Sequence, residues 1–410
     1  MTSSDDTVRS VNLTPSPRAR ELLGALTSFM DECVYPAEAE VTKQRAAGLP
    51  AGHEPAVLDS LRGEAKRRGL WNLCVPGLSG LGYLDYAYIA EVTGRSPDLA
   101  PKSINGGAPD SVNMVMLDAV ATADQRTRFL DPLLAAKSGS AFAMTEPAVA
   151  SSDASNIATT IRRDGDEYVV DGHKWYISGA ANPRCNVLFV VGMSDPTASA
   201  HRRHTVVAVP AGAPGVTIHR AMSVFGYDDD SAEISFDSVR VPAANRLGEE
   251  GHGFAVGQVR LAAARLQHCM RMVGLAERAL ELTCRRAEER LAFGGTLSRK
   301  GQLTAQVAES RIALDQTRLF VLHTAALVDS LGSRAAQSQI SAAKVLAMRT
   351  AVTVLDRAVG VHGAMGVSAD SPLARWWALA RGLHIADGRE EVHLEVLARN
   401  ELAAQEALAR

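Results

Sequence analysis

The spacing of apolar residues changes twice along the chain, and this change limits the folds that the chain can adopt. Up to about residue 139 and again after about residue 253, apolar residues recur every three or four positions, which is typical of amphipathic helices. Between these zones Ala232, Ile234 and Phe236 alternate with polar residues, as in a half-buried strand. We therefore expect a mostly α protein with a central β domain.

Four regions follow from this pattern. Residues 1–14 are polar and are expected to form a disordered tail, and 15–139 an N-terminal helical domain that starts with a helix ended by Pro36. Valine-rich segments bounded by turn residues predict a small antiparallel barrel or sandwich over 140–252. Gly332 separates two long helices within 253–410, which favours an antiparallel C-terminal bundle.

Composition argues against several classes of function. The net charge is −3 and no basic stripe stands out, so we expect no nucleic-acid partner. The five cysteines form no CxxC pair and no histidines have metal-ligand spacing, so we expect neither a disulfide framework nor a metal site. No stretch approaches the ~20 apolar residues of a membrane helix, and the first residues do not resemble a signal peptide. We expect a cytoplasmic protein without membrane insertion.

Two stretches in the central region have residues suited to binding a ligand. The loop Phe142–Pro147, followed by Ser151–Asn156, offers hydroxyls and backbone N–H groups that could hold a flat heterocycle or a phosphate. From composition alone, an ordinary turn into the β domain is the better interpretation. In the stretch Asp171–Ala180, Asp-Gly predicts a hairpin turn that leads into Trp175 and Tyr176. These rings could line a ring-shaped ligand, although packing in the core is the commoner role.

Two further stretches lie in the C-terminal region. Arg290 and the following Phe293-Gly-Gly, ending at Gln302, could grip a pyrophosphate or simply cap a helix. His362–Gly366 has closely spaced glycines that permit close approach of a ligand or another subunit. Asp387 follows the apolar run Leu383–Ala386, so its carboxylate could act as a base in a partly dry pocket. Taken alone, the Asp-Gly pair is more often a turn.

In their order and distances, the four stretches resemble the acyl-CoA dehydrogenase family over nearly the whole chain from Pro15. The subgroup motif Met-Thr-Glu-Pro-x-Val-Ala-Ser-Ser-Asp occurs as Met144–Asp153, and Ala-Asp-Gly-x-x-Glu-Val-His as Ala386–His393. The resemblance implies an N-terminal helical domain, a small β-barrel domain and a C-terminal four-helix bundle, assembled as a homotetramer. It also implies FAD-dependent conversion of an acyl-CoA, or a related acyl thioester, to a trans-2-enoyl thioester. The electrons would pass to an electron-transferring flavoprotein, as in fatty acid metabolism.

The resemblance also implies residue roles. Asp387 would be the catalytic base in place of the usual glutamate, and its N–H would bond the thioester oxygen. Ala264, at the position where some relatives carry the base, cannot act. Substrate would be bound by Ser152, Arg265 and Gly388. The residues expected to bind FAD are Phe142, Met144, Thr145, Ser151, Tyr176, Ile177, Ser178, Arg290, Phe293, Gln302, Gly363, Ala364 and Gly388.

Two departures from the family pattern keep alternatives open. Gly360 replaces a common glutamine, and Ala262–Arg265 replaces Gly-Pro-Gly-Arg. The substrate could therefore be a carrier-protein thioester, or a branched or cyclic acyl group. One alternative function is a flavin oxidase on a non-thioester substrate, similar to nitroalkane oxidases. Another is a non-catalytic family member that acts as a partner subunit.

Overall fold

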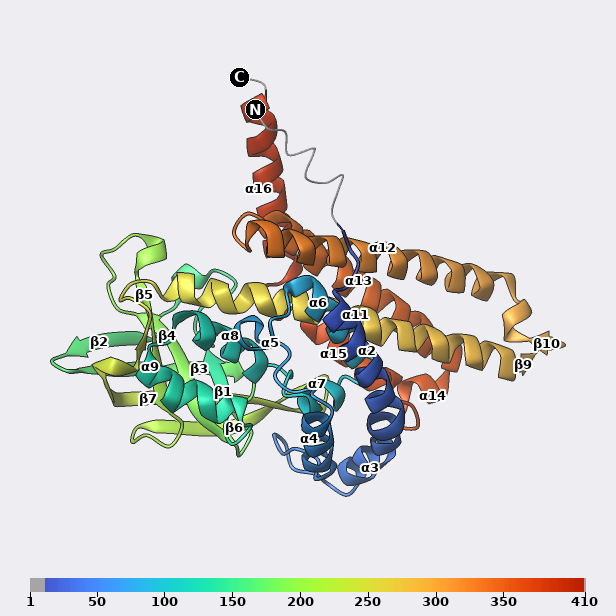
Figure 1. Cartoon of the computed structure of the whole chain (residues 1–410), viewed down its shortest axis with the longest axis horizontal. Helices are drawn as coiled ribbons and strands as arrows, with labels where there is room; N and C mark the ends of the chain where they lie inside the picture. The colour runs from blue at the N-terminus through green and yellow to red at the C-terminus, as the bar shows by residue number, and fades with distance from the viewer. Residues whose placement is uncertain (1–11, 409–410) are drawn as a thin grey trace. The chain divides into compact units, whose positions relative to one another are not determined.

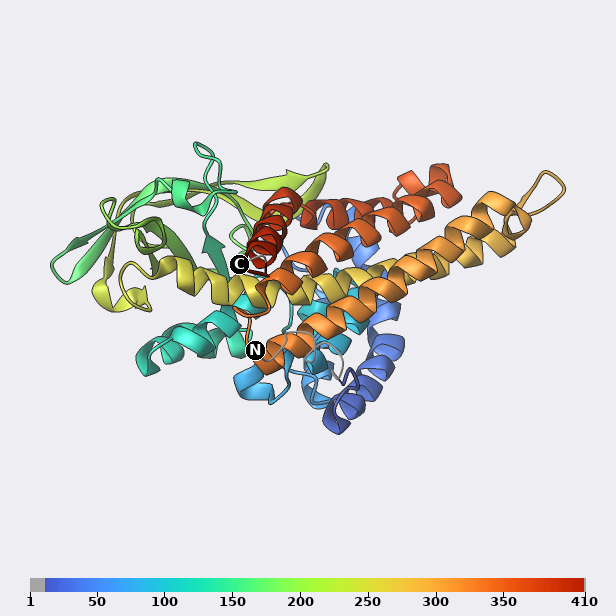
Figure 2. The same ribbon diagram turned by 90° about the horizontal axis from the view of Figure 1, so that it is seen from above.

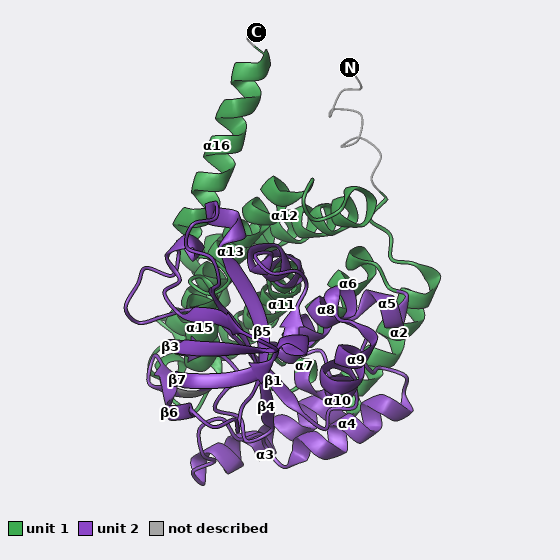
Figure 3. Ribbon diagram, turned by 90° about the vertical axis from the view of Figure 1, so that its left-hand side faces the viewer, with its two compact units in different colours: residues 1–32, 81–101, 264–410 green, residues 33–80, 102–263 purple. Residues whose placement is uncertain are grey.

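The computed structural model describes residues 12–408, so most of the tail predicted for 1–14 lies outside the described residues. The chain falls into two compact units, drawn in different colours in Figure 3. Unit 1 takes the residues before Cys33, Leu81–Pro101 and the residues from Ala264 onward, and unit 2 takes Cys33–Gly80 and Lys102–Ala263. This division does not test the domain boundaries expected from the sequence, which stay a prediction.

Unit 1 is built from helices. Its helices pack in pairs, with α13 against α12, α15 and α16, and with α6 against α2 and α12. The helices are α2 (Pro17–Phe29), α6 (Tyr83–Gly94), α11 (Gly253–Glu289, in unit 1 from Ala264), α12 (Gly301–Leu331), α13 (Gln337–His362), α14 (Ala364–Val367), α15 (Leu373–Leu383) and α16 (Glu390–Leu408). A two-stranded hairpin of β9 (Leu291–Ala292) and β10 (Gly295–Thr296) joins α11 to α12.

Helix α13 shows why these segments are helical and where they pack. Buried Ala343, Ala347, Ala351, Leu355 and Ala358 recur every three or four residues, so one face of small side chains allows close approach of the neighbouring helices. Figures 1 and 2 show α13 lying beside α12. The two helices are separated at Gly332, whose φ of 82° confirms the predicted break.

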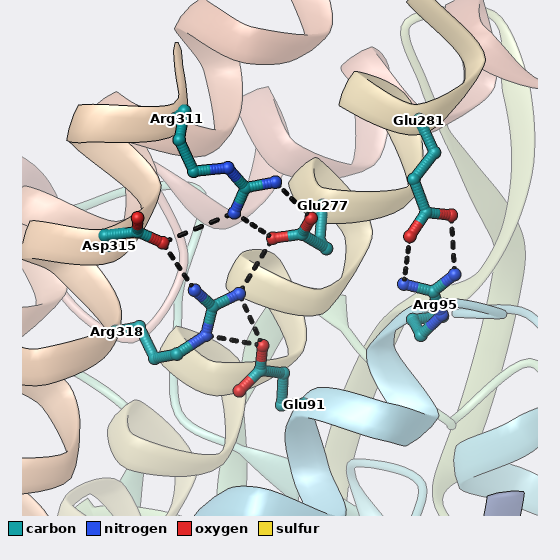
Figure 4. A network of polar contacts seen from close by, with 7 residues as sticks. All are labelled: Glu91, Arg95, Glu277, Glu281, Arg311, Asp315 and Arg318. Atoms are coloured by element: carbon teal, nitrogen blue, oxygen red, sulfur yellow. Dashed lines mark hydrogen bonds and ion pairs between the residues drawn. The ribbon is translucent and has the colours of Figure 1, made fainter. Parts of the chain in front are cut away.

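An ion-pair network ties three helices of unit 1 together (Figure 4). The Arg318 guanidinium donates to Glu91 on α6 at 2.8 Å, to Glu277 on α11 at 2.8 Å and to Asp315 on α12 at 2.9 Å. Arg311 donates to the same Glu277 and to Asp315. Because Glu91 on α6 and Glu277 on α11 pair with arginines of α12, the network links the three helices to one another.

Unit 2 is organised around an eight-stranded sheet in the order β6-β7-β3-β2-β4-β5-β8, with β1 paired to β4. The pairs β1–β4 and β2–β4 are parallel and the others antiparallel, so the sheet is mixed and not purely antiparallel as expected. The strands are β1 (Gly139–Ala143), β2 (Thr160–Asp164), β3 (Glu167–Ile177), β4 (Cys185–Met193), β5 (His204–Pro210), β6 (Val216–Val224), β7 (Tyr227–Pro242) and β8 (Arg246–Leu247). The helices are α3 (Tyr35–Ala46), α4 (Val57–Arg67), α5 (Pro76–Ser79), α8 (Asp110–Val120), α9 (Ala123–Gln125) and α10 (Asp131–Leu134); α7 (Ala100–Ser103) spans the unit boundary.

The sheet core follows the predicted alternation. Ile234 and Phe236 are buried in β7, while Asp237 is exposed. They pack with inward-facing residues of neighbouring strands, including Tyr168, Val170, Leu188, Val190, Val207 and Val209. The period-two pattern therefore identified the buried face correctly.

Two local predictions are wrong. Asp171 and Gly172 do not form a hairpin turn, because both lie inside β3 at an irregularity in its pairing with β7. The glycine is required there, since a Cβ at Gly172 would come within 2.3 Å of the Thr159 hydroxyl oxygen. Pro36 does not end the first helix, because the chain continues through a π-helical turn at Met30–Val34 into α3. Pro36 is the second residue of α3 and directly follows this π-helical turn, so the helix accommodates the proline with a local change of its hydrogen-bond pattern.

None of the helices in the described part of the chain has the length and apolarity required to span a bilayer.

Candidate active site

The turn that follows α15 presents an acidic side chain in a strained backbone position. Helix α15 ends at Leu383, and Asp387 then adopts the left-handed conformation with a φ of 55°. Gly388 follows with a φ of 96°. The Asp387 side chain is 15% exposed, and its Oδ2 lies 3.5 Å from Nε2 of His268 on α11. A non-glycine residue keeps such a conformation only when its surroundings hold it, and this often occurs at functional sites.

Two buried cations hold this turn by its backbone. Arg265 of α11 donates from Nε to the Asp387 carbonyl oxygen at 3.0 Å. Lys344 of α13 donates to the carbonyl oxygens of Leu383 and of Ala386, the latter at 3.0 Å. Burial lowers the pKa of both cations, while the charge of Asp387 opposes that shift. The Asp387 carboxylate therefore lies within electrostatic range of both buried cations.

A buried histidine, His393, packs against the turn at Gly388. The His393 ring on α16 is 2% exposed, and its Nδ1 lies 3.3 Å from the Ser341 hydroxyl oxygen. A Cβ placed on Gly388 would lie 3.0 Å from Nε2 of this ring, so only glycine fits without displacement. Burial lowers the pKa of His393 to about 4, so the ring is neutral at pH 7.

The residues expected to grip a pyrophosphate lie on exposed parts of unit 1. Phe293 is 97% exposed at the tip of the β9–β10 hairpin, with a φ of 50°. Arg290 precedes the hairpin, and Gln302 begins α12. Gly363 and Ala364 follow the C-terminal end of α13.

The pairing of α12 with α13 brings two of the residues expected to bind FAD, Gln302 and Gly363, to the same end of these helices. The Thr317 and Thr350 hydroxyls lie 2.8 Å apart, and Arg357 reaches the Gln306 carbonyl oxygen at 3.3 Å. The helices therefore run antiparallel, which places Gln302 and Gly363 at the same end of the α12–α13 pair.

In unit 2 the loop after β1 meets the end of β3. The Thr145 hydroxyl donates to the Trp175 carbonyl oxygen at 2.6 Å, and the Trp175 N–H donates to the Thr145 carbonyl oxygen at 3.1 Å. Tyr176 then turns into the left-handed region with a φ of 50° and leaves its ring 47% exposed. The Ser178 hydroxyl lies 3.2 Å from that of Ser231. These contacts hold Thr145 against the last residues of β3, next to the segment that carries Tyr176 and Ser178.

The other residues of unit 2 that were predicted to bind FAD, and Ser152, which was predicted to bind substrate, differ in how far they are exposed. Phe142 is buried in β1, with the Arg260 guanidinium 4.7 Å from its ring centre. Ile177 is buried, and its side chain packs into the sheet core. Ser151 accepts the Glu146 N–H at 2.9 Å, while Met144 is half-buried and Ser152 exposed.

A buried ion pair that sequence reasoning missed anchors the same loop. The Lys174 ammonium is fully buried and donates to Met144 O at 2.9 Å, Glu146 Oε1 at 2.7 Å and Val191 O at 2.8 Å. Glu146 also accepts the N–H groups of Ala158 and Thr159. Burial lowers the pKa of Lys174 to about 8, although Glu146 opposes the shift. The only signal in the sequence was their position inside the two motifs, Thr-Glu-Pro and His-Lys-Trp.

Comparisons with known proteins identify the class to which this fold and these motifs belong. Residues 141–239 match the family model for the acyl-CoA dehydrogenase middle domain, and 251–402 the model for the C-terminal domain. The chain therefore belongs to the acyl-CoA dehydrogenase family, a class of oxidoreductases acting on CH–CH groups. This confirms both the family expected from the motifs and the fold class.

Individual relatives agree with that assignment. "Probable acyl-CoA dehydrogenase FadE2" of Mycobacterium tuberculosis is 48% identical over 96% of this chain and 97% of its own length. Human "Acyl-CoA dehydrogenase family member 11" is 45% identical over 95% of this chain, which spans only 51% of that longer protein. A solved structure from Mycobacterium abscessus, assigned as an acyl-CoA dehydrogenase, is 43% identical with a TM-score of 0.92, covering 96% of this chain and 100% of its own.

Proposed function

We propose that this protein is an FAD-dependent dehydrogenase that converts an acyl-CoA, or a related acyl thioester, to the trans-2-enoyl thioester. One observation carries the proposal. The partly buried Asp387 carboxylate lies at a strained turn held by Arg265 and Lys344, beside His268. Asp387 is also where the resemblance places the base.

Asp387 performs the proton step of this reaction. Its carboxylate takes the proton from the α-carbon, and the electron pair of that C–H bond forms the new C=C bond. The α-proton of a thioester is weakly acidic, so the developing enolate oxygen needs hydrogen-bond donors. The N–H of Asp387 supplies one of them. Bound FAD would supply the acceptor for the β-hydrogen, which would leave as a hydride.

The chain's residues fit FAD in two places. In unit 2, the exposed Tyr176 ring and the Thr145 and Ser178 hydroxyls offer a flat apolar surface with hydrogen-bonding groups, which suits the flavin ring. In unit 1, Arg290, Gln302 and the Gly363–Ala364 turn suit a pyrophosphate and adenine. Gly360 supplies no side chain, although a Cβ there would meet nothing within 4 Å. The remaining predicted contacts, from Phe142 to Gly388, are part of the same proposal.

The proposal includes a homo-oligomer, most simply a tetramer, and an electron-transferring flavoprotein as acceptor. The homo-oligomer is supported by unit 1, because the apolar side chains of Ile312 and Leu319 on α12 are 58% and 57% exposed. Phe293 and Val367 add further exposed apolar surface. A cytoplasmic location and substrate contacts from Ser152 and Arg265 complete the proposal.

The test is an anaerobic titration of the FAD-loaded protein with short, medium, long and branched acyl-CoAs. Bleaching of the flavin absorption by one class, with an enoyl-CoA as product, would support the proposal and narrow the substrate. Reoxidation by an electron-transferring flavoprotein, and slow reoxidation by oxygen, would support the acceptor. A bound flavin that no acyl-CoA bleaches would contradict the acyl-CoA substrate and favour a carrier-bound or non-thioester one. Failure to bind FAD would favour a non-catalytic partner subunit.

A further inference from the structure

The buried Lys344 bonds to the backbone of the base-bearing turn and not to a carboxylate. Its side chain on α13 is 2% exposed, and both acceptors of its ammonium are neutral carbonyl oxygens, those of Leu383 and Ala386. Moving an ammonium out of water is costly, and burial lowers its pKa. A neutral donor could satisfy the carbonyls at the end of a helix at lower cost. The retained charge therefore calls for an explanation beyond capping α15.

The Ala386 carbonyl oxygen, the second acceptor of Lys344, gives a reason for a charged donor at this position. The carbonyl of Ala386 and the N–H of Asp387 are opposite ends of one peptide group. A cation that bonds the oxygen draws electron density through the planar amide and makes the N–H a stronger donor. That N–H belongs to the base itself.

We propose that Lys344 is a positioning residue that acts through the Ala386–Asp387 peptide, strengthening the Asp387 N–H as a donor to the thioester oxygen of the substrate. This inference rests on the proposed function, since it needs a thioester bound beside Asp387. Lys344 does not touch the substrate. It orients the Asp387 N–H, which does contact the substrate, and strengthens that N–H as a hydrogen-bond donor.

The groups around the turn are consistent with this role. Arg265 bonds the next carbonyl, that of Asp387, so two consecutive peptides each accept from a cation. The charged and titratable groups that act on this region include Asp387, Arg265, His268 and Cys269 from the turn and α11, and His393 from α16. His384 at the end of α15 also feels the charge of Lys344, and it pairs with Glu390 at 2.9 Å. His393 is kept neutral by burial, so the fixed positive charges on this backbone are Lys344 and Arg265.

The test measures the polarisation of the bound thioester carbonyl directly. The probe is a 3-thia-acyl-CoA, labelled with ¹³C at the thioester carbonyl, of the chain length that bleaches the flavin. Sulfur replaces its β-carbon, so no hydride can leave and the complex is stable. Isotope-edited infrared spectroscopy of the FAD-loaded protein gives the carbonyl frequency, and exchange of the α-protons with D₂O reports enolate formation.

Lys344→Met should reduce the downshift of the carbonyl frequency on binding and slow α-proton exchange by about tenfold or more, with little change in probe affinity. Lys344→Arg, which keeps the charge, should restore part of both. Arg349→Met is the matched control, because it removes a cation of the same helix whose partner is the Glu390 carboxylate. It should behave as the parent.

Failure of the inference about Lys344 and failure of the proposed dehydrogenase function would give different results. A parent-like frequency and exchange rate in folded Lys344→Met would overturn the inference. Probe that binds the parent with neither downshift nor exchange would instead contradict the proposed function. If Lys344→Met does not fold, Lys344→Gln retains one donor without the charge and carries the test. The inference then requires Lys344→Gln to lose downshift relative to Lys344→Arg, and equal spectra would overturn it.

Discussion

The Glu146–Lys174 ion pair connects the sheet of unit 2 to the loop that carries Met144 and Thr145. Lys174 is 0% and Glu146 3% exposed, and the ammonium also bonds the carbonyl oxygens of Met144 and Val191. Lys174→Met keeps the length of the side chain and removes its charge and three hydrogen bonds. The carboxylate of Glu146 would then stay buried with only the two N–H groups of Ala158 and Thr159.

The size of the effect follows from this geometry. Both groups are charged at pH 7, since the pKa of Lys174 is lowered only to about 8 by burial, and Lys174 with the N–H donors holds the pKa of Glu146 below its usual value despite burial. Removing one partner of a buried ion pair costs about 3–5 kcal/mol, because the other charge is left uncompensated. Glu146→Gln should cost a similar amount. The double variant should cost much less than the sum, because neither charge remains.

Urea unfolding at pH 7, followed by tryptophan fluorescence and circular dichroism, measures these free energies. Lys174→Met should also weaken FAD binding, because the Met144 carbonyl loses its anchor. Arg240→Met is the control within the same sheet. Its ion pairs with Asp164 and Glu167 are about half exposed, so its loss should lower the free energy of unfolding far less than Lys174→Met does. Single variants within 1 kcal/mol of the parent, or an additive double variant, would refute the reasoning.

Three further predictions concern stability. Asp110 is buried beside Ser140, and burial raises its pKa to about 6, so ionising it penalises the folded state above pH 6. Asp110→Asn should therefore be more stable than the parent by up to about 3 kcal/mol at pH 7. In urea unfolding, this gain should vanish as the pH falls from 6 towards 3.8. Burial lowers the pKa of His393 to about 4, so its contribution to stability is complete above pH 6.5 and is lost as the pH falls towards 4. The difference in unfolding free energy between the parent and His393→Gln should therefore shift by about 3 kcal/mol across this pH range. A difference that stays constant with pH would contradict this prediction. Arg318→Met should lower the free energy of unfolding by about 2–3 kcal/mol, because it leaves Glu91 and Glu277 without a shared partner. Arg389→Met removes only the exposed Arg389–Glu391 pair and should leave stability close to that of the parent in the same urea assay.

The elements that the sequence predicted best are those in which burial repeats regularly. Period-two burial along β7 and the small apolar face of α13 both follow from one side of an element packing on a core. The Asp171–Gly172 bulge was missed, because the same dipeptide favours a turn when the pairing partners are unknown. The hairpin turn lies instead at Gly165 and Asp166, between paired Asp164 and Glu167.

The candidate site was predictable only in part, and for a physical reason. Asp387 could be singled out through the family resemblance, because on its own the Asp-Gly pair favours a turn, and the apolar run before it includes Ile385, which is 57% exposed. Lys344, Lys174 and Glu146 could not, because charged residues are normally solvated and their burial depends on carbonyls and N–H groups supplied by distant segments. His268 faces Asp387 from α11, a contact that links positions 119 residues apart and that no local pattern indicates.

The role of Asp387 is tested most directly by anaerobic stopped-flow reduction of the FAD-loaded protein with the acyl-CoA that bleaches it. Asp387→Asn preserves the size of the side chain and the backbone N–H but cannot take the α-proton at pH 7. The account predicts that the variant binds FAD and acyl-CoA as the parent does and that flavin reduction slows by at least about a hundredfold. Reduction at the parent's rate in Asp387→Asn would contradict it.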